Sequence, residues 1–172
     1  TNFVTGATRL NQPSGGDDGF VLSLTDMGAT FRTNWCRFLG GGAADSVRAL
    51  VLQSDGKLAV GGATASSAWL PAADNTYRGG AQDGFLLRLD ADGTPLWSTY
   101  VGGANADAVN ALAAPTNALM VGGVTFSPDN AVNWVDGGFW PDWTKDTDWD
   151  GLPNYDADFS YGLVARWTSE VG

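Results

Sequence analysis

The sequence predicts an all-β protein, and three observations lead to this prediction. Glycine supplies 24 of the 172 residues, about twice its usual share of ~7%, which indicates many tight turns. Of the 19 acidic residues, 18 are Asp and only Glu170 is Glu; Asp favours turns and caps, whereas Glu favours helices. Short runs of β-branched, Leu and aromatic residues lie between turn signals such as Asp-Gly and Gly-Gly. We therefore expect short strands and few long helices.

Four short elements recur along the chain in a fixed order. Their copies lie at 19–28, 84–93 and 162–167 (first element), 35–41 and 97–103 (second), 45–50 and 107–112 (third), and 3–8, 58–64 and 119–125 (fourth). Asp-Gly between two such runs is a hairpin signal, so one unit is expected to be a meander of four antiparallel strands. Four-stranded units repeated radially form a β-propeller. The alternative is a β-sandwich, which does not require its hairpins to recur in order.

The predicted architecture is therefore a set of antiparallel four-stranded β-propeller-type blades, with two full units plus partial units at both ends. About ten strands cannot close a regular ring, because a propeller needs at least about four blades of four strands. The chain also begins with Thr1 rather than Met. We expect it to be part of a larger propeller or assembly, in which open strand edges pair with a protein partner or with neighbouring copies.

The pattern DGFLLRLDADGTPLWSTYVGG at 83–103, together with DSVRALVLQSDGKLAVGGAT at 45–64, resembles the bacterial seven-bladed β-propeller repeat. It is also similar to the related delta repeats of secreted bacterial proteins. The resemblance covers almost all of 1–125 and resumes at 162–167. It implies an extracellular, cell-surface or periplasmic protein without a shared catalytic residue set. Residues 113–117 depart from it, because they lack the clean Asp-Gly turn found at 55–56.

The chain is predicted to have three parts. Residues 1–125 carry the propeller-type repeats, 126–161 form an insertion rich in Trp and Asp, and 162–172 begin the next repeat unit. The insertion holds half of the eight tryptophans and a dense group of aspartates. We expect the chemistry of the protein to lie there.

Residues 146–158 of the insertion have the spacing of a calcium loop. Asp at positions 1, 3 and 5 supplies hard oxygen ligands that converge as the loop curls, and Gly151 permits the sharp turn. The stretch is similar to the thrombospondin type 3 and EF-hand-like loops of bacterial surface proteins, which read D-x-D-x-D-G-L-P-N. The predicted Ca²⁺ ligands are Asp146, Asp148, Asp150, the Leu152 carbonyl, Asn154, Asp156 and Asp158.

Two departures from that loop pattern matter. Trp149 replaces a small residue, and Ala157 stands where an EF-hand carries Glu, so Asp156 or Asp158 must close the ligand shell. The alternative is a solvated acidic loop in which Asp serves turns. Mg²⁺ fits less well than Ca²⁺, because Mg²⁺ tends to keep its waters.

The tryptophans of the insertion have two interpretations. Exposed Trp beside Asp can stack on a sugar and form a lectin-like, calcium-dependent carbohydrate site. Alternatively, together with Phe139, they form a satellite core that holds the long connector against the sheet. The candidate ligand-binding residues are Trp134, Trp140, Trp143 and Trp149.

Charge and composition exclude several classes of function. The chain has no His, which removes a Ser-His-Asp triad and a His-ligated zinc. A net charge of −10 argues against nucleic acid as a partner, and no apolar run approaches the ~18 residues of a membrane span. Cys36 is the single cysteine, so no internal disulfide forms. An enzyme would need two carboxylates facing one cleft, ~5–10 Å apart, and we expect none.

Repeat positions predict structural roles for the remaining polar residues. Asp45 and Asp107 match, which predicts the same hydrogen bond twice. Asp90 and Asp92 lie at a hairpin turn, where a turn role is expected. Arg88 is expected to form a strand-face ion pair, and Cys36 to be a small buried strand residue. The functional expectation is a non-catalytic structural or interaction module of a surface assembly, stabilised by calcium; the alternative is a carbohydrate-binding module.

Overall fold

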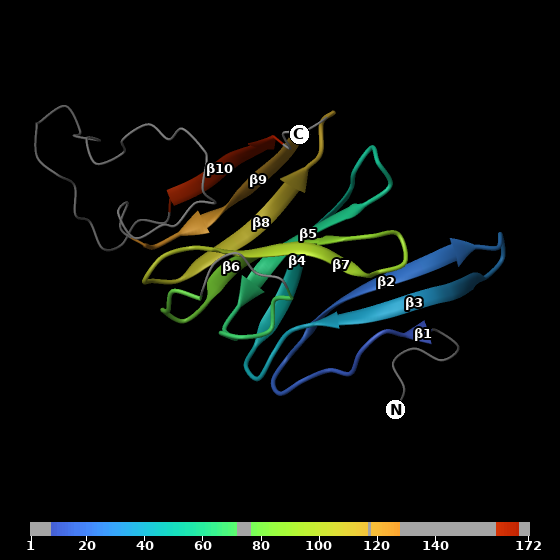
Figure 1. The fold of residues 1–172 in the computed structure, drawn as a ribbon, viewed down its shortest axis with the longest axis horizontal. Coiled ribbons are helices and arrows are strands. Elements are labelled where there is room, and N and C mark those ends of the chain that lie inside the picture. The colour runs from blue at the N-terminus through green and yellow to red at the C-terminus, as the bar shows by residue number, and fades with distance from the viewer. Residues whose placement is uncertain (1–7, 72–76, 117, 128–160, 169–172) are drawn as a thin grey trace, which may run out of the picture.

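The structure, a computed structural model, describes residues 8–71, 77–116, 118–127 and 161–168, and these residues form strands and no helix (Figure 1). The all-β prediction is therefore confirmed for this part of the chain. No helix there is long and apolar enough to cross a membrane. The strands are β1 (Thr8–Arg9), β2 (Gly19–Asp26), β3 (Phe31–Leu39), β4 (Asp45–Leu52), β5 (Leu58–Thr64), β6 (Asp83–Leu89), β7 (Pro95–Val101), β8 (Asp107–Ala113), β9 (Ala118–Thr125) and β10 (Tyr161–Thr168).

The strands form three sheets. The first has the order β1-β3-β2, the central sheet β4-β5-β6-β7, and the third β10-β9-β8. All neighbours are antiparallel except β1, which pairs in parallel with β3. The central sheet lies between the other two (Figure 1).

The predicted starting point of the four-stranded unit is wrong. The central sheet combines the third and fourth elements of one predicted unit with the first and second elements of the next. β3 and β4 belong to different sheets, so the Gly40-Gly41 turn leads from one sheet to the next and does not close a hairpin. The backbone N–H of Asp45 donates to the carbonyl of Asp17 at 2.6 Å, which starts β4 beside the start of β2.

The N-terminal copy of the fourth element, at 3–8, lies outside the described residues except for Thr8, so its pairing stays a prediction. Thr8 and Arg9 pair in parallel with Trp35 and Cys36 of β3. Within the described residues, β2 therefore has only β3 as a neighbour.

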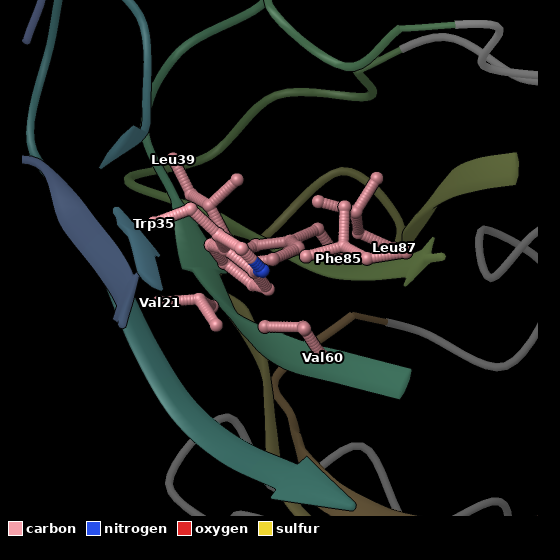
Figure 2. Packing of buried hydrophobic residues seen from close by; sticks show 7 residues of the cluster. Val21, Trp35, Leu39, Val60, Phe85 and Leu87 are labelled. Atoms are coloured by element: carbon pink, nitrogen blue, oxygen red, sulfur yellow. The ribbon is translucent and has the colours of Figure 1, made fainter. Parts of the chain in front are cut away.

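A hydrophobic core fills the space between the first and central sheets. Val21, Trp35 and Leu39 come from the first sheet and pack against Val60, Phe85, Leu87 and Leu89 of the central sheet (Figure 2). Val60, Phe85 and Leu89 have no exposed surface at all. The side chains of β6 that point to this core alternate with Leu86, which points the other way.

A second core joins the central sheet to the third. Ala59, Leu86 and Val101 of the central sheet pack against Val109, Leu119 and Val121. The central strands are thus covered on both faces, which explains why β5 and β6 read as nearly continuous apolar runs. β4 and β8 each carry a bulge, at Arg48 and Asn110, and the Arg48 guanidinium donates to the Asn110 side chain at 3.0 Å.

Candidate functional site

The residues that the sequence singled out for ligands lie outside the described part of the chain. This concerns the calcium loop and the tryptophan group alike. They are Asp146, Asp148, Asp150, Leu152, Asn154, Asp156 and Asp158, and Trp134, Trp140, Trp143 and Trp149. Within the described residues, no three acidic or cysteine side chains lie together in a way that could hold a metal ion. Both predictions therefore stay predictions.

Asp45 is the centre of the polar network between the first and central sheets. Its carboxylate accepts hydrogen bonds from the Gly41 backbone N–H (2.7 Å), from Ser66 Oγ (2.8 Å) and from Thr64 Oγ1. Ser66 Oγ in turn accepts from the Ala43 backbone N–H at 2.9 Å. Since Asp45 is 5% exposed, these bonds replace the water that its charge has lost.

Asp107 has the same surroundings one sheet further on. Its carboxylate accepts from the Gly103 backbone N–H (2.8 Å) and from Ser127 Oγ (2.8 Å). Ser127 Oγ accepts from the Asn105 backbone N–H at 3.0 Å. The prediction of a repeated hydrogen bond at Asp45 and Asp107 is confirmed for the glycine N–H and the serine hydroxyl, whereas the bond from Thr64 to Asp45 has no counterpart at Asp107.

Asp18 and Asp83 are a second matched pair, which the sequence analysis did not recognise; Asp18 is half-buried and Asp83 is fully buried. The carboxylate of Asp18 accepts from the Ser14 N–H (2.6 Å), and that of Asp83 from the Arg78 N–H (2.7 Å). In each of them Oδ1 is buried without a hydrogen-bond partner, as is Oδ1 of Asp107. The available signal was the Asp that precedes Gly-Phe in both copies of the first element.

Four aspartates thus meet in two groups at the same end of the sheets. The Asp107 N–H donates to the Gln82 carbonyl at 2.8 Å, which brings Asp107 next to Asp83. Asp45, Thr64 and Asp83 form one row across β4, β5 and β6. A Cβ on Gly40 would collide with the carboxylates of both Asp18 and Asp45, so only glycine fits between them.

Burial changes the acid–base behaviour of this row. It raises the pKa of Asp83 to about 6, and the nearby Asp107 carboxylate acts in the same direction, while the Arg78 N–H opposes it. Burial likewise raises the pKa of Tyr77 and of Tyr100, with Asp45 and Asp83 adding to the effect. Tyr100 Oη donates to the Ser66 carbonyl at 3.2 Å.

A small cavity lies beside this network, but its lining offers little chemistry. Its volume is about 290 Å³, and segments 41–43 and 65–68 line it with Gly, Ala and Ser. No charged side chain lines it. Ser66 is already bonded to Asp45 and Ala43. The aspartates of the network hold loops and sheets together.

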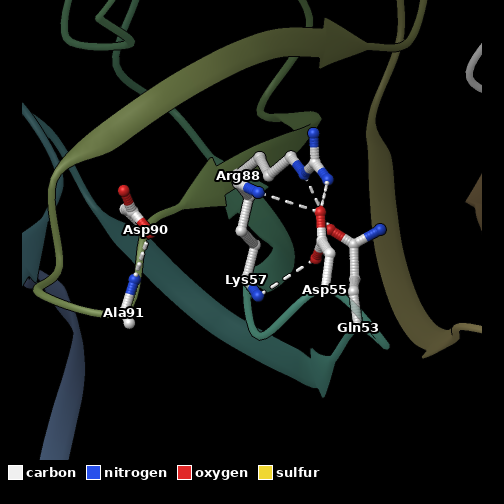
Figure 3. Close-up of polar contacts among 6 residues, drawn as sticks. All are labelled: Gln53, Asp55, Lys57, Arg88, Asp90 and Ala91. Carbon is white, nitrogen blue, oxygen red and sulfur yellow. Dashed lines mark hydrogen bonds and ion pairs between the residues drawn. The ribbon is translucent and has the colours of Figure 1, made fainter. Parts of the chain in front are cut away.

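The other polar predictions concern the hairpin turns and are confirmed. Arg88 Nη2 lies 2.6 Å from Asp55 Oδ2, and Lys57 Nζ lies 3.0 Å from the same atom (Figure 3). Hydrogen bonds from Lys57 hold the pKa of Asp55 below its usual value. Asp90 accepts from the Ala91 N–H at 2.8 Å (Figure 3), and Asp92 accepts from the Thr94 N–H at 2.9 Å.

The prediction for Cys36 is also confirmed, because its side chain is buried and free of any disulfide. Burial raises the pKa of its thiol, which disfavours the reactive thiolate. A comparison with known protein families finds no family model that matches this chain, and no curated protein matches it.

Proposed function

We propose that this chain is a non-catalytic structural and interaction module of an extracellular or cell-surface assembly. Its sheets act as propeller-type blades, and calcium stabilises its insertion. One observation carries the proposal: among the described residues, a four-stranded sheet lies between two smaller sheets, each of which repeats only part of its antiparallel strand order. Three-stranded sheets of this kind invite completion by another polypeptide.

The open edges can be identified by comparison with the central sheet. There, β6 lies between β5 and β7. Among the described residues, its counterpart β2 pairs only with β3, and its counterpart β10 pairs only with β9. An open edge presents unpaired backbone N–H and C=O groups, which favour addition of a strand from a partner.

The buried aspartates support a structural role. Asp45 and Asp107 are 5% and 2% exposed, and Asp83 is fully buried, so a substrate cannot reach their carboxylates. Their partners are backbone N–H groups and hydroxyls of the loops that lead from one sheet to the next. A carboxylate that accepts such bonds stabilises the junction between two sheets.

Calcium removal tests the metal part of the proposal, which rests on the spacing of the aspartates at 146–158. We expect that a chelator lowers the midpoint of thermal unfolding and exposes 126–161 to protease, because close carboxylates repel one another without an ion. Added calcium should reverse both effects, whereas magnesium should not. An unchanged unfolding midpoint and an unchanged cleavage pattern after chelation would remove calcium from the account.

Hydrogen exchange tests the edges. In the native assembled species we expect slow exchange at the β2 amides that do not bond to β3, because a partner strand would cover them. In the dilute monomer the same amides should exchange fast, while the β2 amides that bond to β3 stay slow in both. Fast exchange at this edge in every species would contradict strand addition.

A further inference from the structure

Two buried carboxylates lie where the central sheet meets the third sheet. Asp83 begins β6 and Asp107 begins β8, and the two strands are in contact across the junction. The Asp107 N–H donates to the carbonyl of Gln82 at 2.8 Å, so the first residues of both strands are neighbours. Asp83 is 0% exposed and Asp107 is 2% exposed. Neither charge is therefore solvated by bulk water.

One oxygen of each carboxylate is hydrogen-bonded and the other is not. Asp83 Oδ2 accepts from the Arg78 N–H at 2.7 Å, and Asp107 Oδ2 accepts from the Gly103 N–H and from Ser127 Oγ, both at 2.8 Å. Among the described residues, no donor reaches Asp83 Oδ1 or Asp107 Oδ1, and both atoms are buried. Because a buried charged acceptor without a donor is costly, the two oxygens need a proton or a cation.

A proton meets this need with the groups that are present. Ca²⁺ takes about six to eight oxygen ligands, and the described residues contain no group of three acidic or cysteine side chains that could hold a metal ion. A protonated carboxyl group, in contrast, donates one hydrogen bond to one acceptor. Burial and the nearby Asp107 charge both raise the pKa of Asp83. Asp83 is therefore the carboxyl group that holds the proton.

The matched pair at the junction of the first and central sheets is built differently. Asp18 Oδ1 also lacks a hydrogen-bond partner, but Asp18 is only half-buried. Its neighbour Asp45 has a donor at each oxygen, since Thr64 bonds to Oδ1 and Ser66 bonds to Oδ2. A proton on Asp18 would thus find both oxygens of Asp45 already bonded. We expect proton dependence at the second junction alone.

We propose that Asp83 and Asp107 hold one proton between their Oδ1 atoms, and that the junction between the central and third sheets loosens when this proton is lost to water. Two ionised carboxylates repel each other in a buried site, and separation of the sheets lets water solvate both. Acid therefore closes the junction, and neutral pH weakens it. This control of the junction goes beyond the proposed structural role.

The groups around Asp83 are compatible with this behaviour. The charged and titratable groups that act on it or respond to it are Asp107 on β8, Tyr100 on β7, Asp45 on β4, and Tyr77 and Arg78 in the loop before β6. Burial raises the pKa of both tyrosines above their usual value, so they stay uncharged up to pH 8.

Hydrogen exchange of the full chain from pH 5 to pH 8, corrected for the intrinsic pH dependence of exchange, tests the proposal. The opening equilibrium of the β8 and β9 amides should rise about tenfold over this range. The reason is that Asp83 has a pKa of about 6 in the closed junction and its ordinary value of 3.8 in the open one. In the same chain, carbon-13 NMR should show the Asp83 carboxyl carbon titrating near pH 6.

Three variants separate the pair from its surroundings, and circular dichroism verifies that each is folded. Asp83→Asn keeps an N–H that can donate to Asp107 Oδ1, so its opening equilibrium should not rise with pH. Asp107→Asn removes the neighbouring charge, so the Asp83 carboxyl carbon should titrate at a lower pH. Asp18→Asn is the matched control at the first junction and should keep the tenfold rise.

Three results would overturn the proposal, and the first needs no variant. They are an Asp83 carboxyl carbon that titrates near 3.8 in the unmodified chain, an unchanged titration of Asp83 in Asp107→Asn, and a tenfold rise that persists in Asp83→Asn. A bound cation in place of the proton would also overturn it, and a chelator would then change the titration of Asp83.

The calcium part of the proposed function is tested separately by the sign of the pH effect. Calcium at 146–158 needs ionised carboxylates, so its contribution grows as pH rises, whereas the junction weakens. A repeat of the exchange experiment with a chelator therefore distinguishes failure of this inference from failure of the calcium proposal.

Discussion

Single aspartates connect the sheets of this protein, and Asp45 makes the largest number of these contacts. Its carboxylate accepts three hydrogen bonds, from Gly41, Thr64 and Ser66, while 5% of its surface is exposed. Donors that lose a charged acceptor in a buried site are left without water as well. Asp45 therefore stabilises the junction between the first and central sheets through hydrogen bonds, as the hydrophobic core beside it does through packing.

Asp45→Ala should lower the free energy of unfolding by at least about 3 kcal/mol, because a hydrogen bond to a charged group contributes ~1.5–3 kcal/mol and several are lost together. Equilibrium urea unfolding measures the change. Asp17→Ala, at an exposed neighbour, is the control and should stay within about 0.5 kcal/mol. Equal effects of the two substitutions would show that the network around Asp45 does not stabilise the fold.

Asp83 predicts a pH dependence of stability. Its pKa is raised from 3.8 to about 6 in the folded chain, so the folded state holds a proton that the unfolded state has released. Between these two values, stability falls as pH rises, by about 3 kcal/mol in all. The groups that face it are Asp107, Arg78, Tyr77, Tyr100 and Asp45.

Asp83→Asn removes the titrating group and keeps its shape. Unfolding measured from pH 4 to pH 7 should therefore lose most of this decline in the variant, and the variant should be the more stable protein at pH 7. A decline of the same size in both proteins would mean that other groups cause it.

The sequence predicts the role of a residue when its hydrogen-bond partners lie close to it in the chain, or when residue and partners are repeated together at the same spacing. Asp90 and Asp92 bond within their own turn, and Asp45 and Asp107 share their spacing to Gly41 and Gly103. Asp83 could not be recognised as buried, because its burial requires β8 of the next sheet to lie beside it. The exposure of Asp83 depends on the sheet that packs beside it, and the residues next to Asp83 in the sequence do not show which sheet that is.

Among the described strands, β5 and β8 form the most extensive contact between two sheets. Gly61 of β5 leaves just enough room for Val109 of β8, and Val109 is fully buried. A methyl group added at Gly61 forces a shift in well-packed surroundings, where overpacking costs ~1–3 kcal/mol.

A double-mutant cycle on this contact tests whether the third sheet packs as described. Gly61→Ala and Val109→Ala should each destabilise the protein, whereas the double variant should be more stable than the sum of the two predicts, because the cavity at 109 accepts the new methyl group. Urea unfolding gives the coupling energy. Simple additivity would show that the two side chains are not in contact.

Strand positions followed from the sequence, but the grouping of strands into sheets did not. Apolar runs bounded by Asp55-Gly56 and Asp92-Gly93 coincide with β4 to β7. A hairpin signal shows that two strands are neighbours, but it does not show which strand is the first of a sheet. The boundary between the first and central sheets depends on Gly40 and Asp45. The chain leaves β3 at Gly40, and β4 starts a new sheet where the Asp45 N–H donates to the Asp17 carbonyl.

On the scale of the molecule, the described residues form a stack of three sheets with two apolar junctions. The junctions are alike in their cores, in their aspartates and in the order of their faces. A stack with repeated junctions is suited to continue through further sheets. Together with the open strand edges among the described residues, this property supports the proposed role in assembly.

The mass of the native species, measured over a wide range of protein concentration with and without a calcium chelator, tests this role most directly. We expect masses that are multiples of 17.9 kDa and that grow with concentration. If the loop at 146–158 controls assembly as well as local order, the larger species should dissociate on chelation. A compact monomer of 17.9 kDa under every condition would contradict assembly between copies of this chain.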